Sequence, residues 1–86
     1  MWALRYEKHA EEAFRLLDKS VQRRIAKYMA GICGLEAPEL RGKPMRGDLA
    51  GHWRYRVGAY RVVCRFEHGQ MIVIVVTLGH RSTVYE

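Results

Sequence analysis

Arginine and tyrosine side chains gather in the second half of the chain, at spacings that could support chemistry on a phosphodiester. The stretch WRYRVGAYRVVCRF, residues 53–66, contains Arg54, Arg56, Arg61 and Arg65. The final segment LGHRSTVYE adds Arg81 and Tyr85, with His80 beside Arg81. Guanidinium groups bind phosphate bidentately and stabilise the charge of a pentacovalent phosphorane. Tyrosine can stack on a base, or exchange a proton where neighbouring cations lower its pKa.

RNA is a suitable substrate for such a set, because its own 2′-hydroxyl supplies the nucleophile. Other catalytic constellations do not occur in the sequence. The remaining histidines show no metal-ligand spacing, and RGKPMRG lacks the Walker pattern of a phosphate loop. No pair of carboxylates is spaced as a glycosidase or phosphatase would need. We therefore expect neither a metal nor another cofactor.

A change of periodicity along the chain predicts the element order β-α-α-β-β-β. Residues 1–6 alternate as a short strand, and two amphipathic helical stripes follow, the second ended by Gly31 and Gly34. Strand patterns come at 52–57, 60–67 and 71–78, with a further short one at 82–85. The order predicts an α+β fold in which a two-helix hairpin packs on one face of an antiparallel β-sheet.

The hairpin in the middle of the arginine-rich stretch separates apolar from basic side chains. Gly58-Ala59 fits a two-residue type II′ turn, which would place Arg56 opposite Arg61. One face is then apolar and can cover the helices. The other face carries His52, Arg54, Arg56, Arg61, Val63 and Arg65. We expect this second face to meet water or a ligand, since a like-charge cross-strand pair costs stability and such violations are often functional.

Basic residues also mark the long stretch before the hairpin. Residues 35–51 contain both prolines and are expected to form one long irregular loop, which carries Arg41, Lys43 and Arg46. Residues 41–65 hold seven basic side chains and one acidic one, Asp48. Three interpretations are open: a solvated polar face, a docking surface for an acidic protein, and a surface for nucleic acid.

Length and composition restrict the class of protein. The 86 residues, with 49% hydrophobic and 28% charged side chains, predict one small globular domain spanning 1–86. The longest apolar run, residues 71–76, suits a buried strand and cannot cross a bilayer. No signal-peptide pattern opens the chain. We expect a cytoplasmic protein without a membrane partner, in which Cys33 and Cys64 are buried thiols rather than a disulfide.

Three segments together resemble the RelE branch of the RelE/ParE superfamily of bacterial toxins. They are LRGKP at 40–44, the arginine-rich hairpin at 53–66, and VVTLGHRSTVY at 75–85. The resemblance spans nearly the whole chain. It implies a ribosome-dependent endoribonuclease that enters the ribosomal A site and cuts mRNA there, leaving a 2′,3′-cyclic phosphate and a 5′-hydroxyl.

The resemblance also implies a role for individual residues. The catalytic set of the family matches Arg61, Arg81 and Tyr85. The family commonly has a lysine on the strand before the turn, and Arg54 occupies the nearest position here. Backbone and ribosomal RNA contacts would come from the other basic side chains, namely Arg54, Arg56, Arg65, His52, Arg41, Lys43, Arg46 and His80.

A protein partner follows from the same resemblance. Such toxins are neutralised by a small RelB-like antitoxin, and operator DNA is reached only through the toxin–antitoxin complex. Two other functions stay open. The related ParE branch shares the fold but targets DNA gyrase, and a non-catalytic RNA-binding module would use the same basic surface. The presence of Arg61, Arg81 and Tyr85 together favours the RelE branch.

Overall fold

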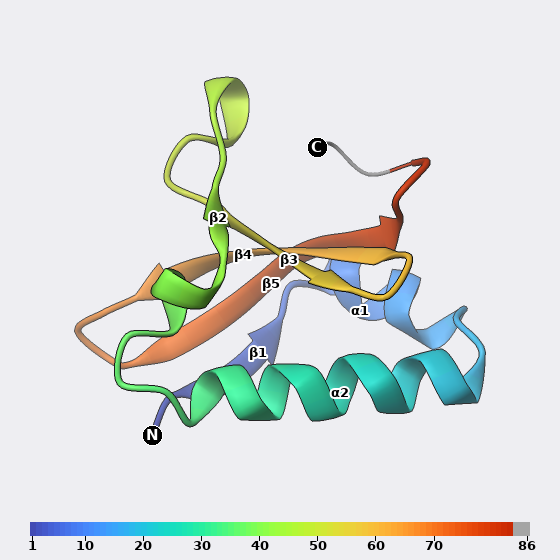
Figure 1. Ribbon diagram of the computed structural model, residues 1–86, viewed down its shortest axis with the longest axis horizontal. Helices are drawn as coiled ribbons and strands as arrows, with labels where there is room; N and C mark the ends of the chain where they lie inside the picture. The colour runs from blue at the N-terminus through green and yellow to red at the C-terminus, as the bar shows by residue number, and fades with distance from the viewer. Residues whose placement is uncertain (84–86) are drawn as a thin grey trace.

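The protein is described here by a computed structural model, which defines residues 1–83 (Figure 1). The predicted β-α-α-β-β-β order is confirmed. The elements are β1 (Ala3–Tyr6), α1 (Lys8–Arg15), α2 (Lys19–Cys33), the 3₁₀ turn η1 (Pro38–Arg41), β2 (Lys43–Pro44), the 3₁₀ turn η2 (Gly47–Leu49), β3 (Trp53–Val57), β4 (Tyr60–Glu67) and β5 (Ile72–His80). Of the short strand expected at 82–85, residues 82 and 83 lie in a turn, and the rest falls outside the described residues.

The five strands form one sheet in the order β1-β5-β4-β3-β2. Three neighbouring pairs are antiparallel, as predicted, but β1 runs parallel to β5. The sheet is therefore mixed rather than wholly antiparallel. The helices between β1 and the later strands allow this, because a parallel neighbour needs a long crossover connection. In Figure 1, α2 lies along one side of the sheet, while the β2 segment and residues 81–83 project on the other side.

The hairpin of β3 and β4 has the predicted register. Val57 pairs with Tyr60 and Arg56 with Arg61, on either side of the turn at residues 58–59. Gly58 has a φ of 60°, and Met71 is the only non-glycine residue with positive φ within residues 1–83. Ala59 therefore has negative φ, as the second position of a type II′ turn requires. A bulge then interrupts the pairing of β4 with β5 between residues 63 and 64.

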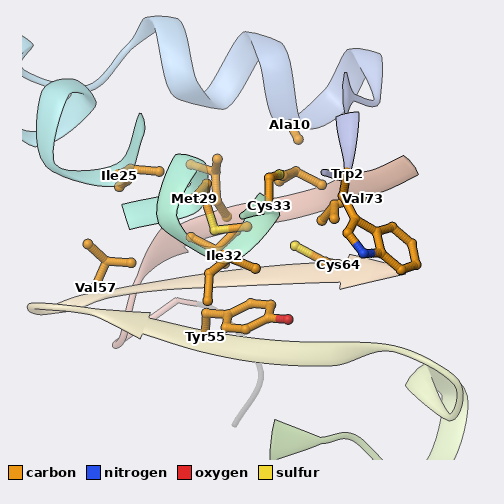
Figure 2. Close-up of a cluster of buried hydrophobic side chains, with 13 residues drawn as sticks. Trp2, Ala10, Ile25, Met29, Ile32, Cys33, Tyr55, Val57, Cys64 and Val73 are labelled. Atoms are coloured by element: carbon orange, nitrogen blue, oxygen red, sulfur yellow. The ribbon is translucent and has the colours of Figure 1, made fainter. Parts of the chain in front are cut away.

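The core lies between the sheet and the helices (Figure 2). Ile25, Met29 and Ile32 recur along α2 at the spacing of one helical face and are almost fully buried. From the sheet, the apolar face of the hairpin meets them with Tyr55, Val57, Val62 and Cys64. The helix continues through Gly31 and ends at Cys33, with Gly34 at its C-cap, so only the second glycine lies at the predicted end. Within residues 1–83, no helix is long and apolar enough to cross a membrane.

A side-chain amide closes the connection between the two helices. The Nε2 group of Gln22 donates to the carbonyl oxygen of Phe14 at 2.9 Å and to that of Leu17 at 3.1 Å. The last carbonyl groups of a helix have no partner within the helix. Gln22 therefore supplies hydrogen bonds where α1 ends, and holds the helical hairpin together.

Residues 35–51 are more ordered than the sequence indicated, since they contain η1, β2 and η2. Tyr55 organises the first part of this stretch. Its buried hydroxyl donates to the carbonyl oxygen of Pro38 at 2.7 Å. The chain then passes close to the Tyr55 ring at Gly42, and Glu39 accepts a hydrogen bond from His68 at 2.7 Å. That hydrogen bond lowers the pKa of Glu39. Contacts with residues distant in the sequence thus order this stretch, and its local composition does not show them.

The close approach of the chain to Tyr55 at Gly42 leads to a prediction about stability. A Cβ at this position would lie 2.9 Å from Cε1 of Tyr55 and 3.2 Å from the carbonyl oxygen of Arg54. We expect Gly42→Ala to lower the free energy of unfolding by about 1–3 kcal/mol, as overpacking typically does. Urea denaturation measures the change. Gly69→Ala is the matched control, because nothing lies within 4 Å of a Cβ at Gly69. Equal stability of the two variants would contradict the conclusion that the close approach of the chain to Tyr55 requires a glycine at position 42.

Candidate nucleic-acid interface

Six cations lie on the face of the sheet that points away from the helices, which we call the basic face. The register places Lys43 beside Arg54, Arg56 beside Arg61, and both Arg5 and Arg65 beside Ile74. Directly paired residues share a face, and alternate residues of one strand do so as well. The basic face therefore comprises Arg5, Lys43, Arg54, Arg56, Arg61 and Arg65.

Two of these arginines are much less exposed than the sequence indicated. Arg54 is 7% exposed and Arg61 is 6% exposed, although we expected the whole face to meet water or a ligand. The Nη1 atom of Arg61 donates to the carbonyl oxygens of Tyr60, at 3.1 Å, and Gly58, at 3.3 Å. Its guanidinium group thus lies against the hairpin turn instead of extending into solvent. A side chain fixed in this way can present charge at a defined position with little loss of conformational entropy.

Arg81 is held at the same end of the sheet as Arg61. Its backbone N–H donates to the carbonyl oxygen of Ala59, in the β3–β4 turn, at 2.8 Å. The Arg81 residue itself is exposed. On β5, the residue paired with Arg61 is Gly79, which has no side chain to cover the arginine from that strand. The two predicted catalytic arginines therefore lie around one turn. The third predicted catalytic residue, Tyr85, is outside the described residues.

His80 precedes Arg81 in the sequence, but its side chain lies on the face that the helices cover rather than on the basic face, because it pairs with Tyr60, which packs against the core. It pairs with Tyr60 across the sheet, and the two rings meet edge to face with centroids 5.6 Å apart. The backbone N–H of Ser82 donates to Nδ1 of His80 at 3.2 Å. The hydroxyl oxygen of Ser82 lies 2.9 Å from the same Nδ1 atom. His80 is exposed, so its ring is accessible to a ligand.

A second group of basic side chains surrounds a hollow of about 580 Å³ beside β2 and η2. Among residues 1–83, Lys43, Arg46 and Arg54 contribute its cations, Asp48 contributes a carboxylate, and Met45 and Leu49 contribute apolar surface. His52 lies just after the segment that lines this hollow, and its Nδ1 atom is 3.2 Å from the carbonyl oxygen of Leu49. The structure thus brings together four of the eight residues predicted to contact RNA outside the catalytic set, namely Lys43, Arg46, His52 and Arg54.

Arg41 and Arg65 lie apart from that group. Arg41, at the end of η1, lines a different groove between α2 and β3. Arg65 is near the opposite end of β4, where it forms ion pairs with Glu7 at 3.4 Å and with Glu67 at 3.1 Å. The positive charge of Arg65 is therefore partly neutralised by the protein itself, which reduces its attraction for an anionic ligand.

Arg5 is a member of the basic face that the sequence analysis missed. The alternation of Trp2, Leu4 and Tyr6 already put Arg5 on the face opposite the apolar residues. What the sequence did not show is that β1 lies next to β5, in parallel, so that Arg5 and Arg65 both pair with Ile74. This pairing is not encoded in any local pattern.

The buried hydroxyl and thiol groups of the core are poor candidates for catalysis. Burial, together with the nearby Cys64, raises the pKa of Tyr55 far above its ordinary value. Burial likewise raises the pKa of both Cys64 and Cys33. A thiolate is the reactive form of cysteine, and burial disfavours it. Within residues 1–83, no group of three or more His, Cys, Asp or Glu side chains is arranged to hold a metal ion.

Residues 2–85 match the family described as "ParE toxin of type II toxin-antitoxin system, parDE". The chain belongs to this family. It is therefore a type II toxin of the RelE/ParE superfamily. The match covers almost the whole chain, including the arginine-rich hairpin and the segment that ends β5.

Individual relatives support the resemblance to the RelE branch. Toxin RelG of Mycobacterium tuberculosis is 26% identical over 84 residues, which is 98% of this chain and 95% of RelG. A chain in the crystal structure of the toxin–antitoxin complex RelBE2 from the same organism has a TM-score of 0.83 at 25% identity, covering 94% of this chain and 92% of that one. Isolated E. coli RelE has the same fold, with a TM-score of 0.77 at 18% identity. The match covers 93% of this chain and 84% of the RelE chain.

The like-charge pair of Arg56 and Arg61 makes a testable contribution to stability. Arg56 is exposed and lies directly opposite Arg61. We expect Arg56→Thr to raise the free energy of unfolding by about 0.2–1 kcal/mol, because it removes a cross-strand repulsion. The gain should shrink at high salt, where exposed charges are screened. Urea denaturation at low and high ionic strength measures both effects.

Arg65→Thr is the control for this prediction. It changes an arginine of the same face to the same residue, but Arg65 has two carboxylate partners. We therefore expect it to leave stability unchanged or to lower it slightly. If Arg56→Thr and Arg65→Thr lowered the free energy of unfolding equally, the repulsion between Arg56 and Arg61 would make no measurable contribution to stability.

Proposed function

We propose that this toxin is a ribosome-dependent endoribonuclease that cleaves mRNA and thereby inhibits translation. The observation that carries the proposal is the position of Arg61. It lies nearly buried at the β3–β4 turn, and the backbone of Arg81 is hydrogen-bonded to that same turn. Arginine side chains that start from neighbouring points of the backbone can reach the same phosphodiester, which guanidinium groups bind bidentately. The resemblance to the RelE branch assigns both residues to catalysis.

The reaction we propose is an in-line attack within the substrate. The 2′-oxygen forms a bond to the adjacent phosphorus, and the bond from phosphorus to the 5′-oxygen breaks. One proton leaves the 2′-hydroxyl and another reaches the 5′-oxygen. Negative charge builds on the phosphoryl oxygens in the transition state, and a guanidinium group held in advance stabilises it without reorganisation. The products are a 2′,3′-cyclic phosphate and a 5′-hydroxyl.

The other residues of the site have distinct roles in this proposal. Arg61 stabilises the charge on the phosphorane, and Arg81 holds the phosphate or assists the leaving 5′-oxygen. Tyr85 stacks on the reacting nucleotide or exchanges a proton with it. Arg54 and Arg56 bind the RNA backbone, and the hollow beside β2 and η2 offers Lys43 and Arg46 to ribosomal RNA. The mixture of apolar and basic surface there suits RNA, whose bases stack while its phosphates pair.

A cognate antitoxin is the proposed protein partner. The RelBE2 structure, the E. coli RelBE complex and an archaeal RelE–RelB complex from Pyrococcus horikoshii each contain a toxin with its antitoxin. Because these toxins share the fold of the present chain, we propose a RelB-like antitoxin that binds it and brings the pair to operator DNA.

The description of the matched family supports a second candidate, a ParE-like inhibitor of DNA gyrase. Such a toxin would block negative supercoiling by purified gyrase and leave ribosome-bound mRNA intact. The two functions make opposite predictions in these two assays, so one preparation of the protein distinguishes them.

Removing either catalytic arginine should abolish most of the cleavage. We expect Arg61→Ala and Arg81→Ala each to lower the rate of cleavage of ribosome-bound mRNA by roughly 10²–10³-fold, because each removes a donor to the developing charge. Single-turnover cleavage of mRNA on purified ribosomes measures the rates. Arg61→Lys tests the shape of the donor, since lysine keeps the charge but loses the bidentate fork.

Two comparisons make this experiment decisive. Arg15→Ala removes an exposed arginine from α1, where it pairs with Glu11 at 3.6 Å, and should cleave like the wild type. Thermal denaturation of each variant shows that it is folded. If Arg61→Ala and Arg81→Ala were folded and cleaved at the wild-type rate, the assigned catalytic centre would be wrong.

The function of Tyr85 can be resolved by two substitutions. A tyrosine that only stacks on a base should be replaced well by phenylalanine and poorly by alanine, since stacking is worth about 1–3 kcal/mol per base. A tyrosine that transfers a proton should fail in both variants. Primer extension on mRNA from growth-arrested cells measures cleavage by Tyr85→Phe and Tyr85→Ala. Full activity of Tyr85→Ala would remove this residue from the proposed mechanism.

A further inference from the structure

The hollow beside β2 and η2 is carried by a projecting segment, residues 43–52, which we call the arm (Figure 1). The backbone of the arm is closed by hydrogen bonds. Beyond the pairing of β2 with β3, the backbone N–H of Met45 donates to the carbonyl oxygen of His52 at 3.0 Å. The N–H of His52 in turn donates to the carbonyl oxygen of Leu49 at 3.0 Å. A ligand of the hollow therefore meets an arm that is already ordered, which lowers the entropic cost of binding.

The hollow offers surface on which a flat ring can pack. Met45 and Leu49 are half-buried and line it together with Pro44. Arg54 lines it as well, and bases stack on the plane of a guanidinium group. The volume of about 580 Å³ lies within the range that is usual for small-molecule sites. The hollow can therefore take up an unstacked nucleotide base.

The exposed polar groups of the hollow are a carboxylate and two cations that do not pair with one another. Asp48 forms no ion pair within residues 1–83, although Lys43 and Arg46 line the same hollow. On α1, by contrast, Arg15 lies 3.6 Å from Glu11. The two oxygens of Asp48 thus remain acceptors for a ligand, and both cations remain available to a phosphate.

A carboxylate of this kind distinguishes among the four bases of RNA. It has two acceptor oxygens and no donor when it is ionised. The Watson–Crick edge of guanine carries two adjacent donors, N1–H and N2–H₂, which match those two oxygens. Adenine, cytosine and uracil each place an acceptor beside their donor on this edge, so one carboxylate oxygen would face a lone pair. Contacts to the Watson–Crick edge are a common means of reading single-stranded RNA.

We propose that the hollow beside β2 and η2 binds an unpaired guanine nucleotide of RNA. Asp48 accepts hydrogen bonds from N1–H and N2–H₂ of the base. The base packs on Met45 and Leu49, and its phosphates pair with Lys43 and Arg46. The inference rests on the proposed function for the RNA partner and deepens it, because it assigns the arm a preference for one base in addition to a general attraction for phosphate.

The test compares two short RNAs that differ in one base. Fluorescence anisotropy measures the Kd of the full-length toxin for fluorescein-labelled UUGUU and UUAUU. We expect UUGUU to bind about 10-fold more tightly, as is typical of one bidentate contact to a base. Asp48→Asn exchanges one acceptor oxygen for a donor and should abolish this preference. It should not weaken binding of UUAUU, because it removes a negative charge.

Asp18→Asn is the matched control. Asp18 is also exposed, its side chain makes no capping hydrogen bond at the start of α2, and it lies outside the hollow. This variant removes the same charge and should keep the 10-fold preference. A preference that persisted in folded Asp48→Asn, or that disappeared equally in Asp18→Asn, would overturn the assignment of guanine to the hollow.

The outcome for the wild type separates this inference from the proposed function. Equal affinities for the two RNAs, or no measurable binding of either, would overturn the guanine site, while cleavage of ribosome-bound mRNA would stand. Ribosome-bound mRNA that stayed intact would overturn the proposed function, whereas a guanine preference lost in Asp48→Asn would still support the site.

Chemical footprinting then shows which RNA supplies the guanine. Kethoxal reacts with N1 and N2 of unpaired guanine, the two atoms that the proposal places on Asp48. Ribosomes carrying mRNA are probed with Arg61→Ala toxin, which should leave the mRNA intact, and with the same toxin that also carries Asp48→Asn. We expect one guanine to be protected only while Asp48 is present, and its place in ribosomal RNA or in mRNA identifies the source. The same protection pattern with both toxins would contradict the proposal.

Discussion

The two-residue turn at Gly58 and Ala59 sets the register of β3 against β4, and the rest of the structure depends on that register. It places Tyr55, Val57 and Val62 toward α2, where they complete the core. A slip of one residue would turn every side chain of one strand to the opposite face. The apolar residues would then meet solvent, and arginines would meet the core. Burial of the core thus fixes the positions of the cations on the basic face.

The basic face has an energetic cost that burial elsewhere must offset. Arg56 lies opposite Arg61, and Lys43 lies beside Arg54. Both Arg54 and Arg61 are nearly buried, and a buried charge needs hydrogen-bond partners, such as the carbonyl oxygens of Gly58 and Tyr60 that accept from Arg61. A surface under selection for stability alone would mix charges, as the protein does around Arg65. The concentration of cations near the turn supports the proposal of an RNA substrate.

Local patterns in the sequence predicted those features that local interactions determine. The helical stripe from Ile25 to Ile32 and the register of Arg56 with Arg61 follow from periodicity and turn chemistry. The parallel pairing of β1 with β5 did not follow, because it joins residues about 70 positions apart through no shared motif. The burial of Arg54 and Arg61 was missed for the same reason, since it depends on which segments cover the sheet. The regular structure within residues 38–44 was also missed, because it depends on the hydrogen bond from the distant Tyr55 hydroxyl to the carbonyl oxygen of Pro38.

The chemical nature of the cleaved ends is the measurement that tests the central claim most directly. Purified toxin is mixed with ribosomes that carry a defined mRNA, and the ends of any fragments are identified by mass spectrometry. The account predicts fragments with a 2′,3′-cyclic phosphate and a 5′-hydroxyl, formed only when ribosomes are present. Intact mRNA, together with inhibition of gyrase supercoiling by the same preparation, would contradict it.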